Sequence, residues 1–475
     1  MHRTSILSLV LASLFAATAA QATPTLIAIG TLGGTSDLSG LTGTLENGLA
    51  GNVLGGLGSG LAWAGGNTFV ATPDRGPNAT TYNSQVDDTT SYIARFQTLK
   101  LDLTAVASGN LPYTLTPTLT ATTLLSSASP LVYGSGTAAG LPNGAPAQNT
   151  AGVNYFTGRS DNFDASQPST NPNNARLDPE AVRVSKDGKS VFISDEYGPY
   201  VYQFDRATGQ RLKTFALPNN LAISTLSAQG AVEIAGNATG RVTNKGMEGL
   251  AISPDGTTLI GIMQASLEQD KNKMVRIVTI DIATGTTHEY AYQLTTGSGV
   301  SEIVALNNHQ FLVDERDGKG LGDGSTAVVK QLFRIDLDGA TDVGNLTGSA
   351  ADQTALKAAA VKKTLVLDLV KVLTANGVTA DQIPSKIEGL AFGDDITLDG
   401  VLSHTLYVAN DNDFVPGLAG DNKIFVFALS DADLGATFTQ QQIPEPESLT
   451  LVLLGLGAMG VTGGLQRRKT GLLQK

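Results

Sequence analysis

The sequence contains no cysteine among its 475 residues, which excludes disulfide frameworks, thiolate nucleophiles, zinc–cysteine sites and iron–sulfur clusters. Histidine is scarce, with four residues, and His2 lies in a segment that we expect to be removed, so a histidine-rich metal site is not expected. Basic residues are in deficit as well: 31 Lys and Arg stand against 43 Asp and Glu, a formal net charge of −12. Because nucleic-acid binding requires a basic surface, we expect no nucleic-acid partner.

Glycine and apolar residues are abundant instead. The chain has 54 Gly, 41% hydrophobic residues and only 16% charged residues. Long helical periodicity is rare, and the apolar content is too high for a disordered chain. This composition indicates a turn-rich all-β protein.

The first 22 residues have the three parts of a secretory signal peptide. Arg3 precedes an apolar run from Ile6 to Ala17, and the small residues at 20–22 (Ala-Gln-Ala) fit a cleavage site. The alternative is a buried N-terminal helix. Export agrees with the lack of cysteine, because such a chain needs no oxidative folding.

The C-terminal end also has three parts in a fixed order. Pro444-Glu445-Pro446 is followed by the uncharged stretch Leu449–Leu465, just long enough to cross a membrane, and then by basic residues at 467–469. This order resembles the PEP-CTERM sorting signal of Gram-negative bacteria. The resemblance implies processing by an exosortase near Pro444, transient anchoring by the apolar stretch, and residence in the cell envelope or at the cell surface. A plain membrane anchor is the alternative, and in either case residues 444–475 lie outside the folded domain, predicted at 23–443.

The folded part is built from a repeated unit. A phrase that starts with Glu and continues with apolar residues occurs at 180–184, 248–252, 302–306 and 388–392, and a degenerate copy without Glu occurs at 60–63. Asp-Gly or Asn-Asn turn signals follow several copies, and second and third apolar runs come next. Units of this kind predict the four-stranded antiparallel blades of a β-propeller, in preference to a β-sandwich.

Five blades can be counted, and six are predicted. The ring is completed either by Leu26–Leu32, which would pair with C-terminal strands, or by residues 111–135 as a blade without the repeated phrase. Residues 137–176 are rich in Gly, Asn, Pro and Ser and predict a long loop, whereas residues 351–363 predict a short helical insertion.

Acidic residues recur where each first strand begins and where each second strand ends. Since neighbouring antiparallel strands bring these positions together, one edge of every blade is acidic, and we expect the blades to direct these groups into a common mouth. Facing carboxylates are costly unless they are protonated or bind a cation, and oxygen ligands favour Ca²⁺ over Mg²⁺. The candidate metal ligands are Glu180, Asp195, Glu248, Glu302, Glu388 and Asp411. The alternative is that each acid accepts backbone hydrogen bonds at a blade corner.

Several ordered motifs carry a family resemblance. E-G-L-A-I-S-P-D-G, S-D-E-Y-G-P-Y, S-E-I-V-A-L followed by D-E-R-D, and I-E-G-L-A-F-G followed by N-D-N-D-F resemble the phytase-like domain called "esterase-like activity of phytase", over residues 55–430. The resemblance implies a propeller related in architecture to calcium-dependent phytases and a phosphoester or ester hydrolase activity. No R-H-G motif occurs, so the histidine acid phosphatase mechanism does not apply.

A working hypothesis assigns roles within the predicted mouth. Glu196 and Glu315 are candidate general bases, and Arg75 and Arg316 are candidate ligands for phosphate oxygens. The rival hypothesis is a non-catalytic propeller that binds polysaccharide or protein in the envelope and uses calcium for rigidity. Arginines that point into the same mouth as the glutamates favour the hydrolase.

Overall fold

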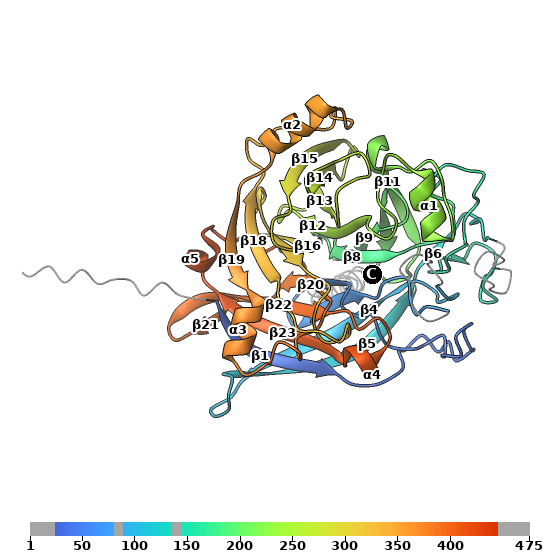
Figure 1. The fold of residues 1–475 in the computed structure, drawn as a ribbon. Coiled ribbons are helices and arrows are strands. Elements are labelled where there is room, and N and C mark those ends of the chain that lie inside the picture. Colours follow the sequence, from blue (N-terminus) through green and yellow to red (C-terminus); the bar gives the residue numbers. More distant parts are fainter. Residues whose placement is uncertain (1–23, 80–88, 135–144, 445–475) are drawn as a thin grey trace, which may run out of the picture.

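A computed structural model describes residues 24–79, 89–134 and 145–444. Five four-stranded antiparallel sheets are arranged around a common centre (Figure 1). The predicted signal peptide at 1–22 and the predicted membrane stretch at 449–465 lie outside the described residues.

Each blade runs outward from an inner strand that lines the centre. Blade 1 contains β2 (Gly60–Trp63), β3 (Thr68–Thr72), β4 (Arg95–Ala105) and β5 (Tyr113–Leu124). Blade 2 contains β8 (Pro179–Val184), β9 (Ser190–Asp195), β10 (Tyr200–Asp205) and β11 (Arg211–Ala216). Blade 3 contains β12 (Met247–Ile252), β13 (Thr258–Met263), β14 (Met274–Asp281) and β15 (Thr287–Gln293). Blade 4 contains β16 (Gly299–Ala305), β17 (Gln310–Arg316), β18 (Lys330–Asp336) and β19 (Lys363–Asp368).

Blade 5 joins the two ends of the domain. Its strands are, from the inside, β20 (Ile387–Phe392), β22 (Val401–Asn410), β23 (Asn422–Leu429) and β1 (Thr25–Leu32), and a short β21 (Ile396–Leu398) pairs with β22. β1 is thus the segment that closes the ring, the first of the two ways the sequence left open. Residues 111–135 were the other candidate for a sixth blade, but Tyr113–Leu124 form β5, the outer strand of blade 1. Within the described residues, five blades complete the circle.

The inner strands follow from the repeated phrase. β8, β12 and β20 are buried along their whole length, because a strand between two neighbouring blades has no solvent-facing side. They also approach one another closely: a Cβ atom on Gly249 would lie 2.8 Å from the Ile303 nitrogen of the next blade. The turns that follow have Gly188 and Gly256 at positive φ (72° and 74°), as Asp-Gly hairpins require.

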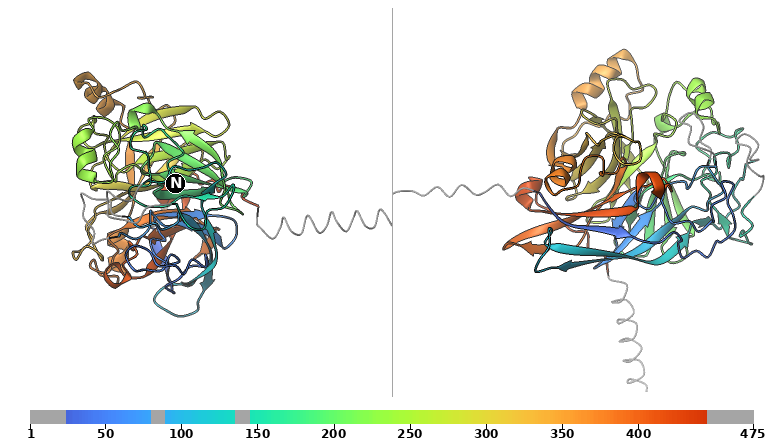
Figure 2. Two further views of the ribbon diagram at one scale, coloured as in Figure 1. Left: turned by 90° about the vertical axis from the view of Figure 1, so that its right-hand side faces the viewer. Right: turned by 60° about the horizontal axis from the view of Figure 1, so that its bottom comes forward.

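Several helices and two short strands lie outside the five blades. The helices are α1 (Gly230–Gly236), α2 (Ala350–Ala359), α3 (Leu369–Ala375), α4 (Pro416–Ala419), α5 (Asp431–Leu434) and the 3₁₀ turn η1 (Asn219–Leu221), and β6 (Ser126–Ser127) pairs with β7 (Asn154–Tyr155). α2 is the predicted helical insertion and projects from the outer edge of the ring (Figure 2). No helix in the described part of the chain is both long enough and apolar enough to cross a membrane.

Candidate functional site

The inner strands form a closed circle. β2, β8, β12, β16 and β20 each contact the inner strand of the blade on either side. Their first residues therefore meet around one end of the central axis, beside the last residues of the second strands. We call this end the axial basin; its charged residues are Asp74, Arg75, Asp178, Glu180, Glu196, Glu248, Arg316, Lys386, Glu388, Asp411 and Asp413.

One group of carboxylates in the basin comes from blade 2. Asp178, Glu180 and Glu196 each offer an oxygen, and these oxygens lie within 4.8 Å of one another. All three residues are buried. Burial, followed by the charge of Glu248, raises the pKa of Glu180 and of Glu196 well above the ordinary value. We call these three residues the first triad.

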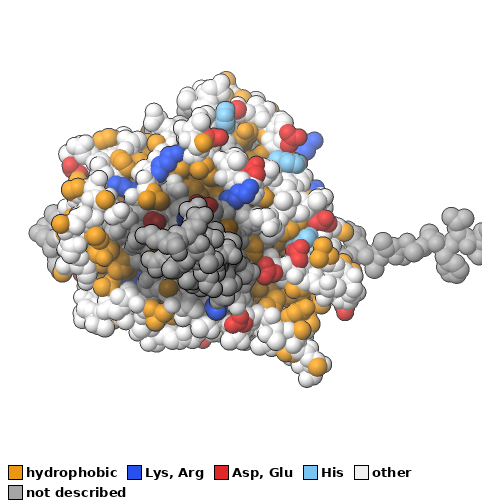
Figure 3. All heavy atoms as spheres, turned by 180° about the vertical axis from the view of Figure 1, so that it is seen from behind, with side chains coloured by type: hydrophobic (Ala, Val, Ile, Leu, Met, Phe, Trp, Pro, Cys, Tyr) orange, Lys and Arg blue, Asp and Glu red, His pale blue; other side chains and the backbone are white. Residues whose placement is uncertain are grey.

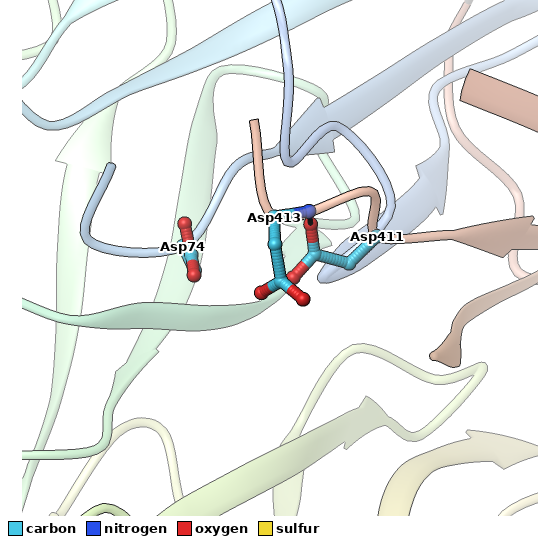
Figure 4. A group of neighbouring side chains, drawn as sticks. All are labelled: Asp74, Asp411 and Asp413. Atoms are coloured by element: carbon cyan, nitrogen blue, oxygen red, sulfur yellow. Dashed lines mark hydrogen bonds between the residues drawn. The ribbon is translucent and has the colours of Figure 1, made fainter. Parts of the chain in front are cut away.

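The second triad comes from the two chain segments that follow β3 and β22. Oxygens of Asp74, Asp411 and Asp413 also lie within 4.8 Å of one another (Figure 4). The Asp413 backbone N–H donates to Asp411 Oδ1 at 2.7 Å, which folds the turn over its own carboxylates. Asp413 and Phe414 both adopt positive φ, of 50° and 56°, so this turn holds backbone strain of the kind that concentrates at functional sites.

Three cations lie among these carboxylates. The Arg75 Nη1 is 3.2 Å from Asp178 Oδ2, and Arg316 contacts Glu388 and is 3.7 Å from Glu248 Oε1. Lys386 Nζ is 3.1 Å from Asp411 Oδ2 and also contacts Asp413. Burial would raise the pKa of Asp413, but Lys386, Arg75 and Arg316 together lower it. The two arginines therefore converge on the same basin as the glutamates.

Glu248 lies between the triads and has one buried carboxylate oxygen without a partner among the described residues. Its Oε1 accepts a hydrogen bond from Gln264 at 2.6 Å, whereas no residue in the described part of the chain donates to its buried Oε2. Burial and the neighbouring Glu388 raise the pKa of Glu248 to about 8. An unpaired buried oxygen of this kind indicates a carboxyl group that either holds a proton or faces a cation.

Glu302 does not join the basin, although the sequence predicted it as a metal ligand. Its carboxylate accepts hydrogen bonds from the backbone N–H groups of Leu250 (3.0 Å) and Ile303 (2.8 Å) and forms an ion pair with Arg183 at 2.9 Å. Arg183 also donates to Leu61 O and Ile303 O, at 2.7 and 2.8 Å. This pair joins blades 1, 2, 3 and 4 near the axis, so Glu302 stabilises the fold at a blade corner.

A shift of one residue in blade 4 explains the different place of Glu302. The backbone N–H groups that close the hairpin turns after the four Glu-bearing inner strands belong to Ser185, Ser253, Leu306 and Gly393. Glu180, Glu248 and Glu388 each precede their turn residue by five positions, but Glu302 precedes Leu306 by four. Since side chains alternate along a strand, this offset places Glu302 on the other side, and Ser301 occupies the position that faces the basin. The Ser301 hydroxyl accepts a hydrogen bond from Arg316.

Asp195 and Glu315 also point away from the basin. They are the last strand residues before Glu196 and Arg316, and alternation sends them to the opposite side. Asp195 accepts from the N–H groups of Asp178 (3.2 Å) and Tyr197 (3.1 Å). Glu315 binds Lys363 and accepts from Tyr292 Oη at 2.6 Å, between the outer parts of blades 3 and 4. The structure therefore does not bring Asp195, predicted as a metal ligand, or Glu315, predicted as a base, together with the basin residues.

The sequence reasoning missed two charged members of the basin. Asp178 and Lys386 each lie two residues before a basin glutamate, Glu180 and Glu388, just outside the predicted strands. Both residues precede the repeated Glu by the same number of positions. An alignment of the internal repeats would have shown this signal. Asp74 and Asp413 were not among the predicted ligands either. Of the predicted metal ligands, Glu180 and Asp411 belong to the triads, and Glu248 and Glu388 lie beside them.

Comparisons with known proteins identify a family and a sorting motif. A phytase-like family model, described as esterase-like activity of phytase, matches residues 52–414, and a PEP-CTERM protein-sorting motif matches residues 442–469. An uncharacterized secreted protein of Arthroderma benhamiae is 33% identical over 177 residues, which cover 30% of this chain and 34% of that protein. The chain thus spans about a third of the length of this curated relative.

Solved structures share only a general likeness. Kuenenia stuttgartiensis hydrazine synthase is 11% identical with a TM-score of 0.31, and the match covers 79% of this chain and 86% of that one. Saccharomyces cerevisiae Sqt1 is 7% identical with a TM-score of 0.28, and the match covers 78% and 72% of the two chains. At such low scores, neither likeness says anything about function.

Proposed function

Because the chain belongs to the phytase-like family described by esterase-like activity of phytase, we propose that it is a calcium-dependent phosphoester or ester hydrolase that acts in the axial basin. The chain is an exported propeller with a PEP-CTERM sorting signal, which implies processing by exosortase-type machinery. The observation that carries the proposal is the pair of carboxylate triads that face one basin together with Arg75 and Arg316.

The two triads fit a hard cation. Oxygen ligands bind Ca²⁺ at about 2.4 Å, so two ligands of one ion are at most about 4.8 Å apart. The oxygens of each triad meet this limit. In addition, the unpaired Oε2 of Glu248 offers a further buried oxygen. Asp178 and Glu180 would hold one ion beside Glu196, which is left as the candidate base, and Asp74, Asp411 and Asp413 would hold another.

The balance of charge explains why a phosphate substrate requires the cation. The basin has eight carboxylates and three cationic side chains, so a phosphate group is repelled by the protein alone. Bound calcium supplies the positive charge that compensates the carboxylates. Arg75 and Arg316 lie in the same basin. Each planar guanidinium group can donate hydrogen bonds to two phosphate oxygens at once.

Glu196 remains the candidate general base. Its side chain is buried, its Oε1 accepts a hydrogen bond from the Gly246 N–H at 3.1 Å, and its pKa is raised by burial and by neighbouring carboxylates. A carboxylate whose pKa is raised is a stronger base toward water than an ordinary, exposed carboxylate. We do not assign the base role to Glu315, because its carboxylate pairs with Lys363 and accepts a hydrogen bond from Tyr292.

A rival proposal has one observation in its favour. Each of the three cations already pairs with a carboxylate: Arg75 with Asp178, Arg316 with Glu388, and Lys386 with Asp411. This supports a rigid, ion-stabilised propeller that binds envelope polysaccharide or protein and catalyses nothing.

A hydrolysis assay on the purified, chelator-treated protein distinguishes the two proposals. Phytate, p-nitrophenyl phosphate and p-nitrophenyl acetate are tested while Ca²⁺ is titrated. We expect hydrolysis that rises with Ca²⁺ and is lost in Glu180→Gln and Glu196→Gln, whereas Asp338→Asn, an exposed carboxylate in a turn, keeps full activity. Stabilisation by Ca²⁺ without hydrolysis of any of these substrates supports the rival proposal. Activity that does not depend on chelation contradicts the metal role.

A further inference from the structure

The last part of the described chain crosses the end of the propeller that is opposite the basin. After α5, residues 436–444 run over the central axis; we call this segment the C-terminal strap. The Thr439 N–H donates to Leu306 O at 2.8 Å. Gln440 and Gln441 donate side-chain hydrogen bonds to Phe392 O (3.4 Å) and Val184 O (3.2 Å). The strap is therefore bound to the inner strands or turns of blades 4, 5 and 2.

Apolar contacts hold the strap in the same place. The Phe438 ring lies 4.5 Å from the rings of Phe392 and His404, centre to centre. At the other end, Ile443 is only 8% exposed and belongs to the hydrophobic cluster of blades 1 and 2. Folding thus includes the chain as far as Ile443, and processing near Pro444 leaves the strap in the domain.

Strand direction shows that the strap and the basin occupy opposite ends of the axis. Glu180 stands near the start of β8, and Val184, which the strap contacts, is its last residue. Four strand residues correspond to about 13 Å. The pair of Arg183 and Glu302 lies between them. Figure 3 shows the molecule from behind, with acidic, basic and histidine side chains interspersed among apolar ones over the visible part of this face.

The sorting motif at residues 442–469 starts within the strap, so the chain leaves the domain at this end. We propose that the strap end faces the membrane while the sorting segment holds the protein there, and that the axial basin faces away from it. The partner of the strap end is a lipid surface. This inference does not depend on the hydrolase activity, because it rests on the path of the chain and on the sorting motif.

The lack of native cysteine permits a direct test with single labels. Full-length variants Lys189→Cys and Leu418→Cys are labelled with one fluorophore and mixed with phosphatidylcholine vesicles that carry a headgroup quencher. Lys189 marks the strap end: it is exposed and adjacent to Gly188, where a Cβ atom would lie 3.4 Å from Ile443. Leu418 marks the basin end: it is 69% exposed on α4, which follows the second triad.

We expect the full-length protein to float with the vesicles, with loss of fluorescence at position 189 and little loss at position 418. The same variants truncated after Pro444 are the control and should neither float nor be quenched. Equal or stronger quenching at position 418, or a full-length chain that does not float, overturns the proposal. A chain without hydrolase activity that shows the expected quenching leaves it intact.

Discussion

Replacing Arg183 with methionine tests the assignment of the axial ion pair to the fold rather than to the metal site. The side chain is 6% exposed and donates to Leu61 O, Val182 O and Ile303 O, in addition to its ion pair with Glu302. Methionine keeps the apolar length of the chain but removes the charge. The variant therefore leaves the Glu302 carboxylate buried without a counter-charge, which costs about 3–5 kcal/mol.

The expected change in melting temperature follows from the size of the domain. Unfolding entropy is about 2.1 cal/mol/K per residue, so about 400 residues give ~0.8 kcal/mol/K. A loss of 3–5 kcal/mol then lowers Tm by about 4–6 °C. Differential scanning fluorimetry measures this shift, and Lys186→Met, an exposed neighbour on the turn after β8, is the matched control, expected within about 0.5 kcal/mol of the parent.

The double variant Arg183→Met/Glu302→Gln tests whether the lost stability comes from the unpaired charge of Glu302. Glutamine still accepts hydrogen bonds from the Leu250 and Ile303 N–H groups but carries no charge, so most of the lost stability should return. Calcium titration of the double variant should match that of the parent, because Glu302 lies outside both triads. A single variant that loses less than about 1 kcal/mol, or a double variant as unstable as the single one, refutes the assignment.

Further predictions concern pH, a close backbone contact and the strap. The pKa values of Glu248 (about 8) and Asp411 (about 7) are above their unfolded values of 4.5 and 3.8, so the folded state binds more protons, and the stability of the ion-free protein falls as pH rises through this range. Calcium requires the ionised carboxylates, so its stabilising effect on Tm should be larger near about pH 9 than near about pH 5; an effect independent of pH contradicts this. In Gly158→Ala, the new Cβ would lie 1.6 Å from Arg75 O, so we expect a loss of about 1–3 kcal/mol together with weaker hydrolysis, whereas Gly33→Ala, with nothing within 4 Å, should resemble the parent in both assays. Phe438→Ala removes the ring contacts with Phe392 and His404 and should cost about 1–3 kcal/mol in thermal unfolding; an unchanged Tm would show that the strap is not part of the cooperative fold.

The repeated phrase was sufficient to predict the blades and the acidic end of the axis. Asp-Gly turns set the hairpins, and the fully apolar runs after Glu248 and Glu388 indicate strands buried on both sides. The number of blades was not predictable in the same way. Whether Leu26–Leu32 forms a separate blade or completes the last one depends on pairing with β23 at the far end of the chain, which local sequence does not encode.

The site was predicted only in part because a strand has two sides. Asp195 and Glu196 are adjacent in sequence, yet only Glu196 faces the basin, and the same alternation separates Glu315 from Arg316. The phrase containing Glu302 resembles the others, but its single-residue offset is visible only when the count starts from the hairpin turn. Residue type therefore located the correct edge of each blade, and register decided which side chains reach its centre.

The pairing of β1 with β23 has a consequence for export. The strand that leaves the cytoplasm first, just behind the predicted signal peptide, must wait for the strand that leaves among the last before the circle can close. Blades 1 to 4 consist of consecutive strands and can form as they emerge, but the join between first and last blade cannot. The architecture thus delays completion of the domain until nearly the whole chain is available for pairing, because this contact joins residues far apart in the sequence.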